Sequence, residues 1–414
     1  MTQTIIIGAG LAGLTATYEL LKAGQDVQLV EASDRIGGRA YTVPLAAGQY
    51  GEFGAEFVDQ HHTALQAYVA EFNLALDPAL QPDDLYWWVE GKLCNWETLP
   101  ESNRIALEQL NTQLSQLLEQ QADPAQTLEQ WLKTVSMTPF AQRMARRDAR
   151  SLFTADADTI GVGFFAQLSD IDEVSFRIRS GSSRLAEAFA QRLSGRIRTQ
   201  SVVRRIQQQA EQGILTIESD GMSEMVAQQV VVAIPWSVLR HLPIDAPLTD
   251  GQRTAIAQLP YGNAVKTLLQ YPYRFWERAN FGIALVEEEY QALWEPTFAQ
   301  VGVERILACL SGGTPSLNLG EQTYNLADQS VRALYPNAPS PMMAVSHDWN
   351  RDEWAQGAYC YFGPGDLHRF NPDLGLPAGR VFFAGEHTAD ANYRGYMEGA
   401  IRSGQRAARQ VLMY

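Results

Sequence analysis

The sequence predicts an α/β protein with two domains, and three observations support this fold class. Near the amino terminus, the apolar run Ile5–Ile7 leads into a glycine-rich turn and then into an apolar stripe with helical spacing. Residues 77–170 carry leucines at helical spacing, whereas residues 261–370 alternate like strands separated by aromatic loops. A chain of 414 residues is also long enough to bury two sizeable cores.

The first element is a strand–turn–helix unit that carries glycines in G-x-G-x-x-G spacing. Gly8 allows the tight turn, Gly10 lets a pyrophosphate approach the backbone, and Gly13 lets the helix pack closely on the strand. The helix begins near Leu11 and Ala12, where unpaired N–H groups and the positive end of the helix dipole attract phosphate. This unit therefore predicts a bound dinucleotide.

The second strand, Val27–Val30, ends on Glu31, which is placed to accept a hydrogen bond from a ribose hydroxyl. Arg35, Gly38 and Arg39 follow directly. A glycine turn flanked by guanidinium groups suits a pyrophosphate that runs past two loops. Together these two units resemble the amino-terminal signature of the flavin-containing amine oxidase superfamily. The resemblance implies that the dinucleotide is FAD.

Composition and charge exclude several other classes of protein. Hydrophobic residues make up 46% of the chain, and the net charge of −15 argues against nucleic acid or anionic membrane surfaces as partners. Cys94, Cys309 and Cys360 have no paired or metal-like spacing, so we expect neither disulfides nor a zinc site. The same cysteine usage favours a reducing compartment. The apolar stretch Ile5–Leu21 is interrupted by turn residues and lacks a basic leader, and the chain ends at Tyr414 without an apolar tail. We therefore expect a soluble cytoplasmic protein with no integral membrane segment.

The remaining elements follow from local patterns of apolar and turn residues. We expect a strand entering a glycine turn at 50–57, then a mostly helical insertion at 77–170 with a helix start at Thr127, and a helix at 185–193. Strands are expected at 201–208, 214–219 and 228–234, separated by turns at 211–213 and 220–221. A buried strand at 381–383 and a last helix at 395–412, with a small-residue face, complete the chain.

The carboxy-terminal blocks 383–388 and 395–400 look like the second FAD signature of the amine oxidases. The resemblance implies that Gly385 and Glu386 lie along the pyrophosphate and ribityl chain. A helix that starts at Met397, after Gly395, would aim N–H groups at the pyrimidine edge of the flavin and stabilise negative charge there. Further cofactor contacts implied by the resemblance are Gly54, Ala55 and Glu56 beneath the flavin and the backbone of Val203 at the adenine.

A third block, residues 349–359, resembles the segment that lies over the flavin face in this family. Ala358 stands where monoamine oxidases have the cysteine that binds flavin covalently, so we expect noncovalent FAD. Trp349 is expected to form a wall beside the flavin. Tyr359 and Tyr396 are expected to face each other in front of it, holding an alkylammonium by cation–π attraction and then aligning the neutral amine.

Lys266 is a charge in the middle of an apolar strand. Its residue type alone is compatible with an edge-strand lysine that reaches solvent, whereas the resemblance implies a lysine that holds a water against flavin N5. Glu56 and Asp59 are candidates for recognising a second amino group. His61 and His62 follow closely, but the other histidines lie in separate loops, so we expect no metal site.

The resemblance also implies the domain organisation. It predicts a Rossmann-like FAD-binding domain with an inserted β-meander, built from residues 1–76, 190–260 and 371–414. A discontinuous α+β substrate domain is then built from residues 77–189 and 261–370.

The implied function is that of an FAD-dependent amine oxidase. The enzyme oxidises a small-molecule amine or amino acid to an imine, and dioxygen reoxidises the flavin to give hydrogen peroxide. An L-amino-acid oxidase is the near alternative, although this sequence has no arginine near Glu56 to grip a carboxylate. A carotenoid- or porphyrinogen-type desaturase and a flavoprotein without turnover are more distant alternatives. The sequence does not indicate which oligomeric state the protein adopts.

Overall fold

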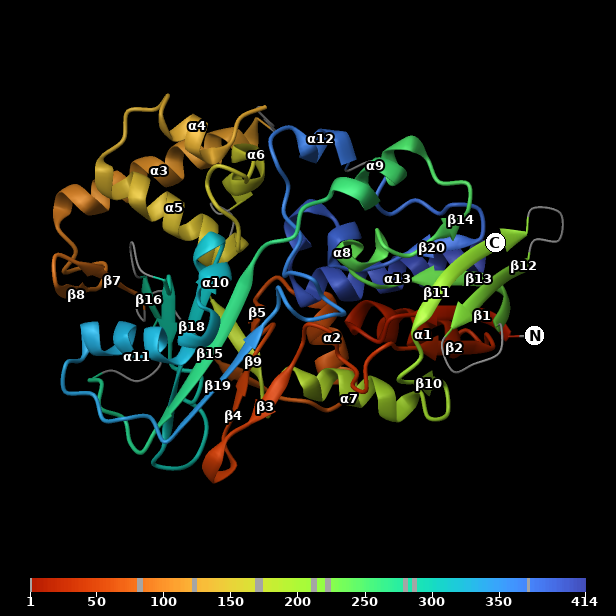
Figure 1. Ribbon diagram of the computed structural model, residues 1–414, viewed down its shortest axis with the longest axis horizontal. Coiled ribbons are helices and arrows are strands. Elements are labelled where there is room, and N and C mark those ends of the chain that lie inside the picture. Colours follow the sequence, from red (N-terminus) through yellow and green to blue (C-terminus); the bar gives the residue numbers. More distant parts are fainter. Residues whose placement is uncertain are drawn as a thin grey trace.

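The computed structural model describes residues 2–79, 85–120, 125–167, 174–209, 214–219, 225–277, 282–284, 289–370 and 373–414 of the chain. Two large β-sheets organise these residues, the first on the right of Figure 1 and the second on the left, with helices packed around both. The expected mixed α/β fold is thereby confirmed. No described helix combines the length and the apolar character needed to cross a membrane.

The first sheet grows around the amino-terminal strand. Its order is β10-β2-β1-β13-β12-β11-β14, with β20 also paired to β13. Strands β2, β1, β13 and β20 run parallel, whereas β13, β12 and β11 follow one another antiparallel. The bounds are β1 Thr2–Ile7, β2 Val27–Val30, β10 Ile197–Arg198, β11 Val203–Gln209, β12 Ile214–Ser219, β13 Met225–Val232, β14 Ile244–Asp245 and β20 Val381–Phe383.

Two features of this sheet match its sequence. Ile5, Ile6 and Ile7 are buried, as a strand covered on both faces requires. The three expected runs at 201–234 form the consecutive antiparallel strands β11, β12 and β13. Their expected connecting turns at 211–213 and 220–221 lie outside the described residues.

Helices α1 (Leu11–Lys22) and α13 (Met397–Met413) pack against each other beside this sheet. A methyl group on Gly404 would overlap the carbonyl oxygen of Ala12, so the small-residue face of α13 is what allows the close approach. The contact brings the two ends of the chain together at the glycine motif.

The second sheet has the order β19-β15-β18-β17-β16-β7-β8. Its interior strand β15 is buried along its whole length and pairs antiparallel with β18 and β19. Lys266 lies in β15, so the alternative of an edge-strand lysine is wrong. The bounds are β7 Leu85–Val89, β8 Lys92–Cys94, β15 Ala264–Tyr271, β16 Gly282–Ala284, β17 Ala292–Trp294, β18 Arg305–Gly312 and β19 Met343–Asp348.

The block 77–170 is mostly helical, as expected, and holds α3, α4, α5 and α6. Thr127 starts α4 with a capping box: its hydroxyl accepts from the Gln130 amide, and its own amide donates to the Gln130 side chain. The β7–β8 hairpin in this block was not expected. It completes the second sheet by parallel pairing of β7 with β16, about two hundred residues away.

The other elements connect the two sheets. Helix bounds are α2 Thr63–Glu71, α3 Glu101–Glu119, α4 Leu128–Leu132, α5 Pro139–Phe153, α6 Val162–Phe165, α7 Ser183–Arg192, α8 Trp236–Leu239, α9 Asp250–Gln258, α10 Thr314–Asn318, α11 Thr323–Leu334 and α12 Asp366–Phe370. Small sheets are formed by β3 Thr42–Pro44 with β4 Tyr50–Glu52, and by β5 Phe57–Asp59, β9 Ser175–Ile178 and β6 Leu76–Pro78. The expected division at residue 189 falls inside α7, which packs in the same core as α1.

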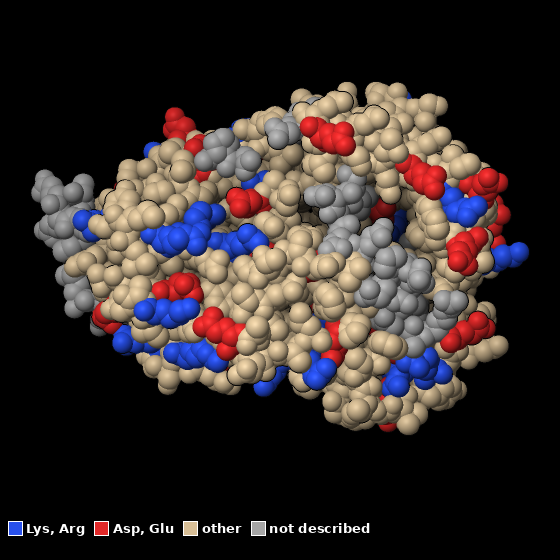
Figure 2. All heavy atoms as spheres, turned by 180° about the vertical axis from the view of Figure 1, so that it is seen from behind, with Lys and Arg blue, Asp and Glu red and all other residues tan. Residues whose placement is uncertain are grey.

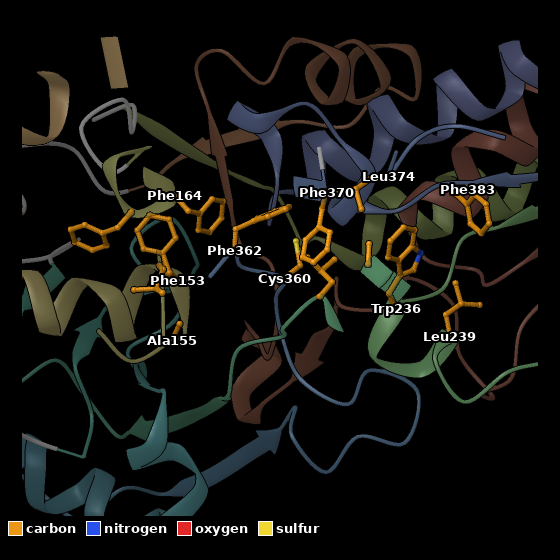
Figure 3. Packing of buried hydrophobic residues seen from close by; sticks show 14 of the residues in the cluster. Phe153, Ala155, Phe164, Trp236, Leu239, Cys360, Phe362, Phe370, Leu374 and Phe383 are labelled. Carbon is orange, nitrogen blue, oxygen red and sulfur yellow. The ribbon is translucent and has the colours of Figure 1, made fainter. Parts of the chain in front are cut away.

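One hydrophobic core spans both halves of the molecule. Figure 3 shows it as a row of side chains that runs from Phe153 of α5 through Phe362 and Phe370 to Trp236 of α8 and Phe383 of β20. Because this core is continuous, the helices of the insertion are fixed relative to the first sheet. On the face seen in Figure 2, which lies behind the view of Figure 1, acidic and basic side chains are interspersed, so the net negative charge forms no single patch on that face.

Candidate active site

One cavity of about 2050 Å³ lies between the two halves of the molecule. It is at least twice the size of a usual small-ligand pocket of roughly 300–1,000 Å³ and so has room for a dinucleotide and a substrate together. Of the site residues predicted from sequence, the following line it: Gly8, Gly10, Leu11, Ala12, Glu31, Arg35, Gly38, Arg39, Gly54, Ala55, Glu56, Val203, Lys266, Trp349, Tyr359, Gly385, Glu386, Gly395, Tyr396 and Met397.

The glycine motif forms one end of this cavity. Gly8 has a φ of +101°, as the tight turn requires, and Gly10 faces open space, with no atom within 4 Å of a methyl group built on it. Gly13 does not line the cavity: its Cα packs against the Gly8 carbonyl, so its contribution is close packing. No side chain caps α1, and its first N–H groups are therefore available to a phosphate. The motif fits a pyrophosphate.

Glu31 is held rigidly beside the motif. Its Oε2 accepts from the Ala9 amide at 2.6 Å, and its Oε1 accepts from the Ser33 amide and hydroxyl, each at 2.9 Å. A carboxylate has about four acceptor positions, so this one retains capacity for a ribose hydroxyl. Arg35 is fixed nearby, since its Nη1 donates to the Gly38 carbonyl at 2.7 Å and its guanidinium lies 4.0 Å from the Tyr41 ring centroid.

Arg39 and Glu386 join the amino-terminal and carboxy-terminal blocks. Arg39 Nη1 donates to Glu386 Oε1 at 2.9 Å, and Glu386 Oε2 accepts from the Gly395 amide at 3.0 Å and from the Cys360 thiol at 2.9 Å. Burial by itself would raise the pKa of Glu386, but the charge of Arg39 and these hydrogen bonds hold it below its usual value. Glu386 is therefore a charged carboxylate inside the cavity wall, with its charge matched by Arg39.

Glu56 is the centre of a second buried network. Its carboxylate accepts from Lys266 Nζ at 2.6 Å, from Arg177 Nε at 2.8 Å and from Trp294 Nε1 at 3.0 Å. Burial would raise the pKa of Glu56, but Lys266 and Arg177 together keep it lowered. Because protein groups already neutralise this carboxylate, Glu56 is poorly suited to recognise an amino group of a substrate. Sequence reasoning missed Arg177 and Trp294.

The aromatic residues Trp349, Tyr359 and Tyr396 form a further part of the cavity wall. The Tyr359 ring lies against Gly395, where a methyl group would approach its Cδ2 to 2.9 Å, and its hydroxyl donates to the Leu152 carbonyl. The Tyr396 ring meets the His62 ring with centroids 5.0 Å apart. Burial raises the pKa of both phenols above the usual value, so both stay protonated at neutral pH. Trp349 is fixed by donating to the Phe53 carbonyl at 2.9 Å.

Asp59, His61 and His62 converge more closely than their sequence indicates. One possible ligand atom from each lies within 4.8 Å of the others. However, His62 Nδ1 accepts from the Asp59 amide at 2.9 Å, so its neutral tautomer carries hydrogen on Nε2, the nitrogen that faces Asp59. That tautomer offers a metal no free lone pair. The expectation that the protein has no metal site stays a prediction.

A dinucleotide motif at one end of a large cavity, with charged and aromatic residues at the other, is the arrangement of a dinucleotide-dependent oxidoreductase. The model of the family described as flavin containing amine oxidoreductase matches residues 11–412. The chain therefore belongs to the flavin-containing amine oxidoreductases, which confirms the resemblance seen in its sequence, and membership implies a flavin cofactor.

Relatives and solved structures agree with this assignment over the whole chain. The protein is 24% identical to a flavin-containing amine oxidase of Oncorhynchus mykiss, covering 99% of this chain and 85% of that protein. It is 25% identical to an L-amino-acid oxidase of Pseudechis australis, covering 99% and 86%. A putrescine oxidase structure with bound putrescine superposes with a TM-score of 0.89 at 22% identity, over 100% of this chain and 99% of the other. Cyclohexylamine oxidase from Brevibacterium oxydans gives 0.86 at 24% identity, over 100% and 99%. These structural likenesses establish a shared fold.

Proposed function

We propose that this protein is an FAD-dependent amine oxidase that holds FAD without a covalent bond. The observation that carries the proposal is the convergence of the glycine motif, the Arg39–Glu386 pair and the Tyr359 and Tyr396 phenols on one cavity. The substrate is a small amine and the second substrate is dioxygen.

The cofactor is assigned to the half of the cavity nearest the first sheet. Gly10 and the start of α1 receive the pyrophosphate, Glu31 the ribose, and the backbone of Val203 the adenine. The first turn of α13, beginning at Met397, supports the flavin ring. We also propose that residues 1–76, 190–260 and 371–414 form a Rossmann-like FAD-binding domain with an inserted β-meander, and that α7 joins this domain because it packs in the same core as α1. The rest of residues 77–189, together with 261–370, is assigned to the substrate domain.

Ala358 supports noncovalent binding, because this cavity-lining position has no thiol to attach to the flavin. Acid precipitation of the yellow protein tests this point. All flavin is expected in the supernatant, and a coloured pellet would contradict the proposal.

Bound FAD supplies the two-electron acceptor that oxidises the amine C–N bond to an imine and is regenerated by dioxygen with release of hydrogen peroxide. The side chains have a positioning task. Tyr359 and Tyr396 attract the alkylammonium through their ring faces and orient the neutral amine. Their raised pKa values keep them from acting as bases at neutral pH. Lys266 Nζ directs one N–H at Glu56 and a second, at 3.4 Å, at the Gly54 carbonyl, and we assign to its third donor the water held near the flavin.

Substrate specificity separates this function from its alternatives. An L-amino-acid oxidase needs a cation for the substrate carboxylate. Arg177, the arginine beside Glu56, pairs with that residue and does not line the cavity, and the cavity-lining Arg147 is already paired with Asp148. Peroxide release should be measured with amines, polyamines and L-amino acids. Peroxide from amines supports the proposal, whereas peroxide from amino acids alone favours the L-amino-acid oxidase.

A flavin-bound protein that releases no peroxide would favour a desaturase or a flavoprotein without turnover. We also propose a cytoplasmic location, supported by three buried cysteines that form no disulfide.

A further inference from the structure

One face of helix α5 forms part of the cavity wall, remote from the glycine motif. The cavity-lining residues of α5 are Met144, Arg147, Asp148, Ser151, Leu152 and Phe153, and the first five follow the i, i+3, i+4, i+7, i+8 spacing of a single helical face. The neighbouring lining includes Leu107, Leu110, Ile283 and Leu293, together with Glu108 and Asn111 of α3. Glu108 and Asn111 are exposed, so the polar residues of the α5 face are the more shielded ones in this part of the wall.

Asp148 is only partly satisfied by the protein. Its Oδ1 accepts from Arg147 Nη1, and Arg147 is itself anchored because its Nε donates to the Gln291 carbonyl at 3.0 Å. Asp148 Oδ2 accepts no hydrogen bond from the described residues, and the side chain is 17% exposed, so this oxygen is open to solvent or to a ligand in the cavity. Burial raises the pKa of Asp148 even though Arg147 opposes the shift, so a cation that reaches this carboxylate would stabilise its charged form.

Ser151 gives an independent indication at the next position on the same face. The residue is 4% exposed, and its buried hydroxyl has no hydrogen-bond partner in the described part of the chain. Buried polar atoms in native proteins are nearly always hydrogen-bonded, and each exception calls for an explanation such as a ligand. A buried hydroxyl without a partner, about one helical turn from a carboxylate oxygen that accepts no protein hydrogen bond, indicates a ligand that donates hydrogen bonds.

We propose that Asp148 and Ser151 form a subsite for the second ammonium group of a diamine substrate. An ammonium carries three N–H donors and a positive charge, which match one carboxylate oxygen and one hydroxyl. This proposal rests on the proposed amine oxidase function and specifies its substrate class.

The position of the subsite favours a diamine over an α-amino acid. The Tyr359 hydroxyl donates to the carbonyl of Leu152, and Asp148 lies one helical turn earlier, which is about 6 Å along the axis. Side chains lean toward the helix amino terminus, so the Asp148 carboxylate lies still farther from the phenol. The second charged group of the substrate must therefore be several bonds from the reacting amine, whereas an amino acid carries its carboxylate on the adjacent carbon.

Peroxide release tests the subsite in the FAD-loaded protein. We compare kcat/KM for α,ω-diamines from propane to hexane with kcat/KM for the linear monoamines of equal length. The wild type should prefer the diamine, and Asp148→Asn should lower the diamine-to-monoamine ratio by about 10- to 100-fold, as expected for hydrogen bonds to a charged group. Ser151→Ala should lower it less. Glu119→Gln, which removes an exposed carboxylate of α3, is the matched control and should leave the ratio unchanged.

A ratio that Asp148→Asn does not change would overturn the subsite while leaving the amine oxidase function intact. Preference for ω-amino carboxylates, lost in Arg147→Lys, would also overturn it, since Arg147 would then be the recognition group. Calorimetry with 2,5-dimethylhexane-2,5-diamine, whose amino-bearing carbons carry no hydrogen, gives a test independent of turnover. This diamine should bind more tightly than the monoamine 2-methylhexan-2-amine, and the difference in affinity should be seen only in proteins that retain Asp148. Equal binding of the two amines, or binding of neither, contradicts the subsite.

Discussion

Lys266 and Glu56 form a buried ion pair in the wall of the cavity, with Nζ and Oε2 2.6 Å apart and side chains only 5% and 2% exposed. Removing such charges from water costs several kcal/mol per ion, and only further partners make the pair favourable. Arg177 and the Trp294 indole supply those partners. Lys266 also lies 4.7 Å from the centroid of the Trp294 ring. The pair therefore fixes the direction of the lysine that we expect to hold a water.

The first prediction concerns the stability of this pair. Lys266→Met should destabilise the fold by about 3 kcal/mol, the low end for breaking a buried pair, because Arg177 still faces the abandoned carboxylate. The double variant Lys266→Met/Glu56→Gln should lose less than the sum of the two single variants, which urea unfolding measures. Additive losses would mean that the two residues are not coupled. Lys266→Arg, which keeps the charge, is the control.

The second prediction concerns pH and Glu52, which is buried beneath the same network. Burial raises the pKa of Glu52 to about 8, and Glu56 adds to the effect, although the carboxylate accepts from the Ser182 amide at 2.8 Å. The native state thus holds a proton that the unfolded chain releases near pH 4.5. Since the native state binds more protons, the free energy of unfolding should fall as pH rises from about 4.5 to about 8.

Glu52→Gln removes this titration. At about 1.4 kcal/mol per pKa unit, the variant should be more stable than wild type above pH 8 by at most a few kcal/mol, with the difference disappearing below pH 4.5. Urea midpoints measured across this range check the expectation. The exposed carboxylate variant Glu119→Gln should retain the wild-type slope, and an identical slope in Glu52→Gln would refute the assigned pKa.

Local sequence patterns predicted those parts of the site that depend on neighbouring residues. The strand, the turn at Gly8 and the helix after Gly10 follow from spacing alone, and so does the small face of α13 at Gly404. Closely spaced glycines permit a turn and a close approach that residues with a Cβ cannot adopt, so the phosphate-binding motif is visible without knowledge of the tertiary fold.

The parts that sequence reasoning missed depend on long-range pairing. Arg177 meets Glu56 only because β9 pairs with β5 across more than a hundred residues. The polar face of α5 is marked by the spacing of Arg147, Asp148 and Ser151. However, helical spacing alone does not distinguish a cavity wall from a solvated face. Strands β7 and β8 were missed because they are short and their sheet partner β16 lies far away in the chain. Helix α11 was missed although its buried residues Ala327, Val331 and Leu334 follow helical spacing.

The third prediction separates two glycines of one motif. A methyl group on Gly10 meets no protein atom, whereas a methyl group on Gly13 would overlap the Gly8 carbonyl. Gly10→Val should therefore keep the fold but weaken flavin binding about tenfold or more, equivalent to ~1.4 kcal/mol. Gly13→Ala should destabilise the protein itself by roughly 1–3 kcal/mol through overpacking. Flavin absorbance per protein and the thermal midpoint without added FAD report the two effects. A Gly10→Val protein with full flavin content would show that the pyrophosphate does not bind at Gly10.

The last prediction concerns Tyr396, whose ring lies in the cavity wall against His62. If the ring holds the substrate ammonium, Tyr396→Ala should lower kcat/KM for amines roughly 3- to 30-fold, matching a cation–π contribution of about 0.5–2 kcal/mol. Tyr396→Phe keeps the ring face and should lose little. It should also keep the wild-type pH profile, because burial raises the pKa of the phenol out of the working range. Both variants should remain yellow, since the residue is assigned to the substrate and not to the cofactor. A colourless Tyr396→Ala protein would instead make the ring a support for the flavin.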